Sequence, residues 1–344
     1  MKPSILAQTL VQFIKNQESI LILGQPGSGK TAITEQVATS LIWDDGKPYD
    51  FLTMHPVVSE PPDIGGYAFK IDDKRAGKLP VGDMYLLVTA ERPTVVLIDD
   101  IGQASPVIQA SLMQVLWARS VGEQHISDFV TFIGASNRKE DNAKVSGLIE
   151  PIKSRFSSIV TLNVHVPDWI TWAINAGMPI PLIAYVGQFR PDVFDNWKPT
   201  NDLSNTASPR TMAAAGRIML KMNIPIEAQE EVLSGAIGRN VAIDMIAFMK
   251  TFKKMPILDH IIMSPATADI PKDDPAVMYA VMAGLARKST DKNFDAVVTY
   301  LDRVGKTHEE YTAVCVKAAS DRDQSLKYHG AYTKWCATHS HLLS

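Results

Sequence analysis

The stretch that decides the fold is Gly24-Gln25-Pro26-Gly27-Ser28-Gly29-Lys30-Thr31, which matches the phosphate-binding pattern G-x-x-x-x-G-K-[ST]. The apolar run 20–23 before it predicts a buried strand, and residues 31–41 after it have apolar side chains at helical spacing. Glycines between a strand and a helix let consecutive backbone N–H groups turn toward phosphates. We therefore expect these eight residues to bind a nucleotide, with Lys30 on the β- and γ-phosphates and Thr31 on Mg²⁺.

Composition favours an ordinary soluble protein of two or three domains, since the chain has 344 residues of which 46% are hydrophobic. A formal net charge of -3 gives no overall basic field, so nucleic acid is not an expected partner. The two cysteines, Cys315 and Cys336, indicate a reducing compartment and not a disulfide framework. Residues 1–15 lack the uninterrupted apolar core and the small-residue cleavage site expected of a signal peptide, and the sequence contains no run of about 18 apolar residues. We expect a cytoplasmic protein without a membrane partner.

Short apolar runs alternate with helical patterns over residues 19–162, which is typical of a parallel sheet covered by helices. Beyond Val164 the strand signals stop. The sequence therefore predicts an α/β fold with a five-stranded parallel P-loop NTPase sheet flanked by helices, followed by an all-helical lid and a helical C-terminal extension. The predicted boundaries are 1–165 for the nucleotide-binding domain, 166–263 for the lid and 264–344 for the extension. The expected strands are 20–23, 50–53, 94–98, 129–134 and 158–162; the expected helices after them are 167–176, 181–188, 209–222, 225–235, 241–252, 276–288, 294–303, 309–319 and 325–337.

Two carboxylates, Asp99 and Asp100, directly follow the apolar run 94–98. A buried strand of this kind delivers both acids to the carboxyl edge of the sheet, where the phosphate loop also lies. We expect Asp99 to bind Mg²⁺ and Asp100 to polarise the attacking water. Without the phosphate loop, the same residues would indicate a strand that ends in a solvated turn.

Three further stretches complete a resemblance to the AAA+ ATPases: the strand that ends at Asn137, the segment Glu150-Pro151-Ile152-Lys153-Ser154-Arg155-Phe156, and the helix start Ser208-Pro209-Arg210. The resemblance implies that Asn137 is the sensor 1 residue, whose amide holds the attacking water. It implies that Arg155 is an arginine finger that enters a neighbouring subunit's site. Arg210 resembles the sensor 2 residue, through which the helical lid reaches back to the phosphates.

The segments Asp63-Ile64-Gly65-Gly66 and Asp99-Asp100-Ile101-Gly102-Gln103-Ala104 narrow the resemblance to the MoxR branch of AAA+ ATPases, relatives of the magnesium chelatase motor subunit. That branch typically has Asp-Glu-Ile-Asn-Arg-Ala, so Asp100 stands where glutamate is usual. The resemblance implies Mg²⁺-dependent ATP hydrolysis, a ring that is usually hexameric, and a protein partner that often carries a von Willebrand factor A (vWA) domain.

The resemblance also implies an insertion at residues 61–80, which holds several basic residues together with Tyr67 and Phe69. In a ring this insertion would face the pore, whereas a charged segment of this kind is equally typical of a solvated surface hairpin. Residues 119–128 are a second candidate pore hairpin.

The function expected from these features is that of an oligomeric ATPase that remodels or activates a protein partner. Two alternatives stay open at this point. One is a nucleic-acid motor or loader. The other is a slow ATP-dependent switch or scaffold, which is favoured because the Asp100 side chain is shorter than the usual glutamate.

Overall fold

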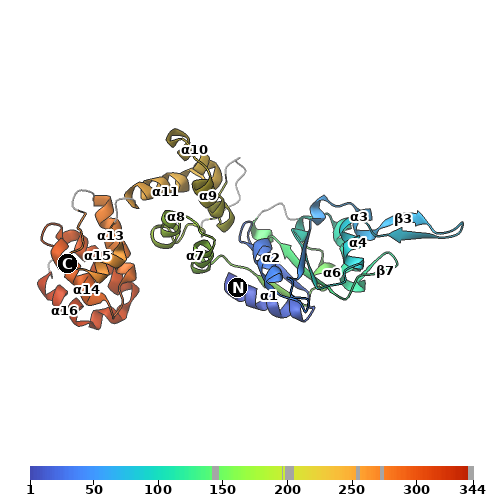
Figure 1. Ribbon diagram of the computed structural model, residues 1–344, viewed down its shortest axis with the longest axis horizontal. Helices are drawn as coiled ribbons and strands as arrows, with labels where there is room; N and C mark the ends of the chain where they lie inside the picture. The colour runs from blue at the N-terminus through green and yellow to red at the C-terminus, as the bar shows by residue number, and fades with distance from the viewer. Residues whose placement is uncertain (142–146, 196, 198–204, 253–255, 272–274, 340–344) are drawn as a thin grey trace. The chain divides into compact units, whose positions relative to one another are not determined.

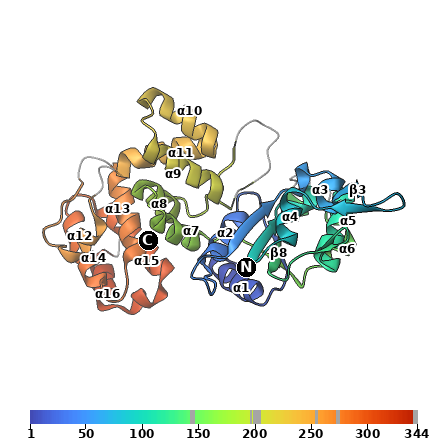
Figure 2. The same ribbon diagram turned by 45° about the vertical axis from the view of Figure 1, so that its right-hand side comes forward.

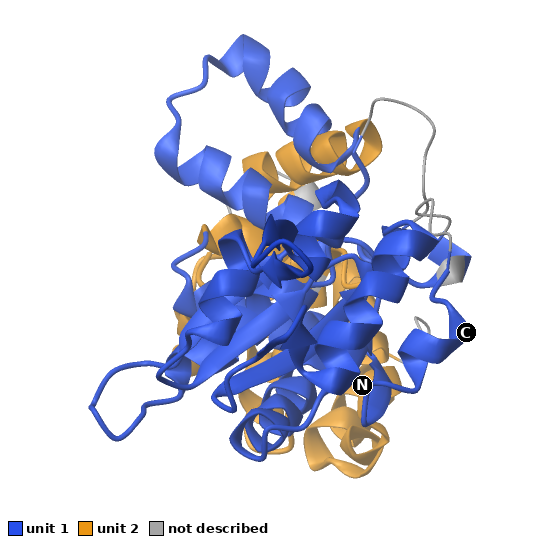
Figure 3. Ribbon diagram, turned by 90° about the vertical axis from the view of Figure 1, so that its right-hand side faces the viewer, with its two compact units in different colours: residues 1–178, 192–238 blue, residues 179–191, 239–344 orange. Residues whose placement is uncertain are grey.

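The computed structural model describes residues 1–344 except 142–146, 196, 198–204, 253–255, 272–274 and 340–344. The chain forms two compact units, one of residues 1–178 and 192–238, the other of residues 179–191 and 239–344 (Figure 3). The boundaries of these two units differ from those of the three domains expected from the sequence. The division into three domains therefore stays a prediction. The polar sequence of residues 195–207 predicts a connecting loop, and most of these residues lie outside the described ranges.

A five-stranded parallel sheet is the centre of the first unit (Figure 1). Its strands are β1 (Ile20–Leu23), β2 (Asp50–Met54), β5 (Thr94–Ile98), β8 (Val130–Ser136) and β9 (Ser158–Thr161), in the order β2-β5-β8-β1-β9. The register places Leu23 opposite Ser136 and Ile98 opposite Gly134. The ends of β1, β5 and β8 therefore meet at one edge, and the predicted five-stranded parallel sheet is confirmed.

Alternate residues of the strands belong to different hydrophobic cores, because successive side chains of a strand point to opposite faces. Ile20 and Ile22 lie in the core beneath α1 (Pro3–Lys15) and α2 (Lys30–Ser40). Leu21 lies in the core on the opposite face. That second core contains side chains of α3 (Pro61–Gly65), α4 (Gly82–Val88), α5 (Pro106–Met113) and α6 (Glu150–Lys153). Both faces of the sheet are thus covered by helices, which is why β1 and β5 consist almost wholly of apolar residues.

Two antiparallel hairpins extend from this domain. One consists of β3 (Tyr67–Lys70) and β4 (Ala76–Leu79), and the other of β6 (Ser120–Val121) and β7 (Gln124–His125). The β3–β4 hairpin projects beyond the sheet in both Figures 1 and 2. Both predicted hairpins are therefore present, and all four residues of β3 are exposed.

The first unit also includes α7 (Val166–Asn175), α9 (Pro209–Lys221) and α10 (Ile226–Ile237). In the second unit, side chains of five helices in the described ranges form a core of their own: α12 (Leu258–Met263), α13 (Pro275–Lys288), α14 (Phe294–Val304), α15 (Glu309–Arg322) and α16 (Gly330–Thr338). This unit also contains α8 (Ile180–Ala184) and α11 (Arg239–Phe252). In the described part of the chain beyond β9, the regular elements are all helical, as predicted. No helix within the described ranges has the length and apolar character needed to cross a bilayer.

Three details differ from the sequence prediction. Helix α12 was not predicted, since six residues are too few for a clear periodicity. The expected helix 181–188 is short α8 followed by a π-helical turn over Tyr185–Phe189. The expected helix 325–337 is a 3₁₀ turn over Gln324–Tyr328 and then α16, because the backbone of His329 is extended between them.

Candidate nucleotide site

The phosphate loop connects β1 to α2 in the way that the sequence predicts. Gly27 and Gly29 have φ angles of 76° and 101°, values that a residue with a Cβ rarely adopts. Helix α2 begins at Lys30 directly after Gly29, so its N-terminal N–H groups and dipole face the loop. The loop therefore has the backbone geometry of an anion-binding site.

The Lys30 ammonium is buried among acceptors at the sheet edge. Its Nζ donates to the carbonyl oxygens of Gly24 at 2.8 Å and Gln25 at 3.2 Å, and to Oδ1 of Asn137 at 2.9 Å. Burial lowers the pKa of Lys30 from 10.5 to about 8, against the opposing attraction of Asp100 and Asp99. A phosphate would replace these neutral acceptors with charged ones, which bind an ammonium more strongly.

Asp99 and Thr31 form the predicted metal-binding pair. The Thr31 hydroxyl donates to Oδ2 of Asp99 at 2.8 Å, so the end of β5 and the start of α2 meet at this point. The part of the chain that the structure describes contains no group of three or more His, Cys, Asp or Glu side chains that could together bind a metal ion. One carboxylate and one hydroxyl suit Mg²⁺, which usually takes its other ligands from phosphates and water.

Asp100 is held in a strained and polar position. Its φ of 53° lies in the left-handed region, which is uncommon for a residue with a side chain. Its Oδ1 accepts hydrogen bonds from Nδ2 of Asn137 at 3.1 Å and from Nε2 of Gln103 at 3.4 Å. Burial raises the pKa of Asp100, and the nearby negative charge of Asp99 raises it further. Asn137 thus connects Lys30 to Asp100 through the two ends of one amide.

Two polar atoms in the loop support a bound phosphate chain. Nε2 of Gln25 and Oγ of Ser28 are buried without a hydrogen-bond partner in the structure. Buried polar atoms are seldom left unpaired, since each costs about 1–3 kcal/mol. As both atoms can donate a hydrogen bond, they fit a ligand rich in acceptors.

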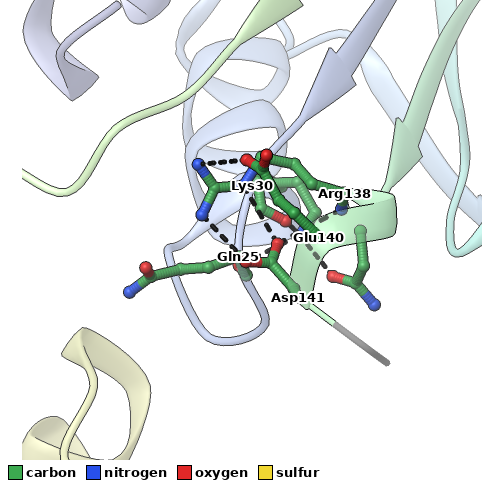
Figure 4. Close-up of polar contacts among 7 residues, drawn as sticks. Gln25, Lys30, Arg138, Glu140 and Asp141 are labelled. Carbon is green, nitrogen blue, oxygen red and sulfur yellow. Dashed lines mark hydrogen bonds and ion pairs between the residues drawn. The ribbon is translucent and has the colours of Figure 1, made fainter. Parts of the chain in front are cut away.

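A second cluster beside Lys30 was not found from the sequence. The Arg138 guanidinium donates to both oxygens of Asp141, from Nε at 3.0 Å and from Nη2 at 2.9 Å, and lies 3.2 Å from Glu140 (Figure 4). Asp141 is buried and its negative charge acts on Lys30. This pairing fixes the backbone directly after Asn137. The only sequence signal for it is the spacing of three residues between Arg138 and Asp141, which is common on surfaces.

Arg210 lies at this site, at the first turn of α9. Its side chain lines the phosphate pocket, and its backbone N–H donates to the carbonyl oxygen of Gly27 at 3.1 Å. Ser208 caps the helix, because its Oγ accepts from the backbone N–H of Thr211 at 3.2 Å. A Cβ at Gly27 would come within 2.7 Å of Oγ of Ser208, so this glycine permits a close approach of α9 to the loop.

Arg155 lies elsewhere on the same domain. It is not among the residues that line the phosphate pocket, and its guanidinium carbon lies 4.5 Å from the centre of the Trp117 ring. The structure therefore brings together every predicted site residue except Arg155.

A larger groove of about 820 Å³ adjoins the phosphate loop and is lined by α1, α2, α7 and α9. Its walls include Ile33, Trp169, Trp172 and Arg217. Its volume lies within the range of about 300–1,000 Å³ that is usual for small-molecule sites. No sequence pattern indicates this groove, because α1 and α2 form it together with α7 and α9, which lie more than a hundred residues later in the chain.

The first part of the chain is similar to one known family. Residues 4–165 match a family model described as the MoxR domain in the MoxR-vWA-beta-propeller ternary systems. No curated protein matches the chain. Similar solved structures include the RuvB Holliday junction branch migration motor of Thermotoga maritima, at 15% identity over 82% of this chain and 80% of that one, with a TM-score of 0.39. Another is NtrX from Brucella abortus in complex with ADP, at 14% identity over 95% and 68% of the two chains, with a TM-score of 0.42. The sheet topology and the family match together identify residues 4–165 as a MoxR-type domain of the AAA+ ATPases.

Proposed function

We propose that this protein is a Mg²⁺-dependent ATPase whose active site is completed by Arg155 of a neighbouring copy in a ring, a hexamer by family resemblance. The observation that carries the proposal is the separation of the candidate residues. Lys30, Asp99 and Asn137 converge on one pocket, whereas Arg155 lies outside it. A pocket with every part except the arginine is what a site shared between two subunits requires.

Each residue in the pocket has a role that its contacts support. The loop amides and Lys30 would hold the phosphates, while Thr31 and Asp99 would hold Mg²⁺. When bound, the metal neutralises charge that develops on the phosphates. Asp100 would accept the proton of the attacking water, and its raised pKa suits a base. The Asn137 amide would orient that water.

The remaining contacts would bind the ends of the nucleotide. Arg210 would reach the terminal phosphate from α9, and the hydrogen bond of its backbone to the loop supports this role. The apolar groove beside the loop is suited to the base and ribose, with Trp172 offering a flat face for stacking.

We further propose that the ATPase acts on a protein partner with a vWA domain in a reducing, cytoplasmic compartment. The description of the matched family names vWA and β-propeller proteins as members of the same systems. The exposed β3–β4 hairpin, with Tyr67 46% and Phe69 42% exposed, is suited to contact a partner or a ring pore. Cys315 and Cys336 are free thiols, which supports the proposal of a reducing compartment.

A slow ATP-dependent switch is the second candidate, and Asp100 is the observation that favours it. This carboxylate is a methylene shorter than glutamate and already accepts two hydrogen bonds from protein groups. Comparing the turnover of the assembled wild type with that of Asp100→Glu separates the candidates, since only a switch should become much faster.

A mixing experiment tests the shared site. Lys30→Ala and Arg155→Ala should each be nearly inactive alone, the second because such an arginine contributes about 10³–10⁵ in rate. Lys30→Ala should also lose tight ATP binding, whereas Arg155→Ala should keep it. In a 1:1 mixture about a quarter of the interfaces pair an intact Lys30 with an intact Arg155, so about a quarter of wild-type turnover should return. A mixture that stays inactive although mixed rings form would exclude the trans role.

The proposed partner is tested by adding a purified vWA-domain protein from the native source. We expect turnover of the wild type to change in proportion to the bound vWA protein, with no response of Lys30→Ala. Stimulation by DNA that is lost at high salt, without any effect of the vWA protein, would support a nucleic-acid motor instead.

A further inference from the structure

The environment of Arg155 is unusual for a surface arginine. Its guanidinium carbon lies 4.5 Å from the centre of the Trp117 ring, a distance typical of a stacked cation–π pair. Its Nε is buried without a hydrogen-bond partner. Trp117 itself is 69% exposed, so the pair lies at the surface. Within the described part of the chain, the aromatic ring is therefore the contact that orients the guanidinium, and the buried Nε has no acceptor.

Trp117 belongs to a segment with special backbone geometry. The segment Gln114–Ala118 at the end of α5 is π-helical, a form that is rare and often found at functional sites. It ends at Arg119, a residue with a side chain whose φ is 47°. The Arg119 guanidinium donates to the carbonyl oxygens of Ser127 at 2.7 Å and Val130 at 3.0 Å. The segment that carries Trp117 is thus attached to the base of the β6–β7 hairpin.

The β6–β7 hairpin in turn contacts the β3–β4 hairpin. The backbone N–H of Lys78 donates to Oε2 of Glu123 at 3.1 Å. A Cβ added at Gly122 would lie 2.6 Å from the Cβ of Lys78, so the two backbones are in direct contact at this glycine. Contacts therefore join β4 at Lys78 to the β6–β7 turn, and the base of that hairpin to the segment that carries Trp117. Trp117 in turn contacts Arg155.

From this geometry we propose that Trp117 is a positioning residue, which holds the Arg155 guanidinium in the orientation needed by the neighbouring subunit and couples it to the two hairpins. The proposal rests on the trans role of Arg155 proposed above. A stack orients an arginine without occupying its N–H groups, so these groups stay available for a phosphate of the next subunit. A displacement of either hairpin would move the turn that carries Trp117. This movement would change the orientation of the Arg155 guanidinium relative to the neighbouring subunit.

The test compares Trp117→Phe with Trp117→Leu in the full-length assembly. Phenylalanine keeps an aromatic face, whereas leucine keeps apolar bulk without one. We expect Trp117→Leu to lower kcat by about tenfold, with KM for MgATP and nucleotide affinity unchanged, and Trp117→Phe to stay within about threefold of the wild type. Trp43→Leu is the matched control, since Trp43 also contacts an arginine, Arg92, in the same domain but away from the pocket. It should leave kcat unchanged.

The link to the hairpins is tested by Gly122→Ala, whose new methyl group must push the two hairpins apart. We expect it to lower kcat in the wild type and to cause no further loss in Trp117→Leu, because both changes act through one contact path. Additive losses would overturn the link.

Equal activities of Trp117→Leu and Trp117→Phe would overturn the positioning role while Arg155→Ala remains inactive. Full activity of Arg155→Ala would instead remove the proposed function on which this inference rests.

Discussion

The buried ammonium of Lys30 should make the free protein more stable as the pH rises from 7 to 9, and Lys30→Met should remove that rise. The folded chain has a pKa of about 8 at this group, against 10.5 for an exposed lysine. Between these two values the unfolded chain binds more protons than the folded chain, so the free energy of unfolding increases with pH. The two pKa values give an increase of about 1.3 kcal/mol from pH 7 to pH 9 and about 2.5 kcal/mol from pH 7 to pH 10.

Urea unfolding without nucleotide at pH 7, 8 and 9 measures this effect. Tryptophan fluorescence reports mainly the first compact unit, since five of the chain's six tryptophans lie in its ranges. Other groups also titrate in this interval, but they are common to the wild type and Lys30→Met. The difference between the two pH profiles therefore isolates Lys30, provided that the m-values agree.

The reasoning would be refuted if the free energies of unfolding of the wild type and of Lys30→Met changed equally with pH. That result would mean that Lys30 has an ordinary pKa in the folded chain. Nucleotide binding gives an independent check. Phosphates favour the charged ammonium, so the affinity for MgATP should decrease above pH 8, and binding at pH 9 should take up a proton from the buffer.

Further substitutions test the site and the core. Asp100→Asn should keep ATP affinity but lower single-turnover hydrolysis by about 10²–10⁴, because the amide cannot accept the water proton; unchanged turnover would remove Asp100 from the role of base. Gly134→Ala should destabilise the first unit by about 1–3 kcal/mol in urea unfolding, since its Cβ would lie 2.6 Å from Phe156 and 2.9 Å from Leu21. Gly235→Ala in α10 is its control, because nothing lies within 4 Å of the added Cβ and it should be neutral or slightly stabilising. Equal losses in the two glycine variants would contradict the packing argument.

The sequence could predict most of the sheet because β1, β5 and β8 are short, mostly apolar and followed by a glycine or a polar residue. It could also place Asp99 and Asn137 at strand ends, yet not the bond between Asn137 and Lys30. These residues are 107 positions apart, and they meet because β8 pairs with β1, an order that no local pattern contains. Arg138 and Trp117 were missed for the same reason. Their roles depend on neighbours supplied by the fold, whereas their local sequences resemble ordinary surface segments.

The hydrogen bond from the backbone N–H of Arg210 to the carbonyl oxygen of Gly27 joins α9 to the loop that would cradle the phosphates. An amide proton in such a bond exchanges with solvent only when the bond opens. The hydrogen-exchange rate of the Arg210 amide would therefore report how often α9 separates from the loop, independently of motions elsewhere in the molecule. If ATP draws α9 toward the loop and its hydrolysis releases it, the Arg210 amide should alternate between slow and fast exchange within each catalytic cycle.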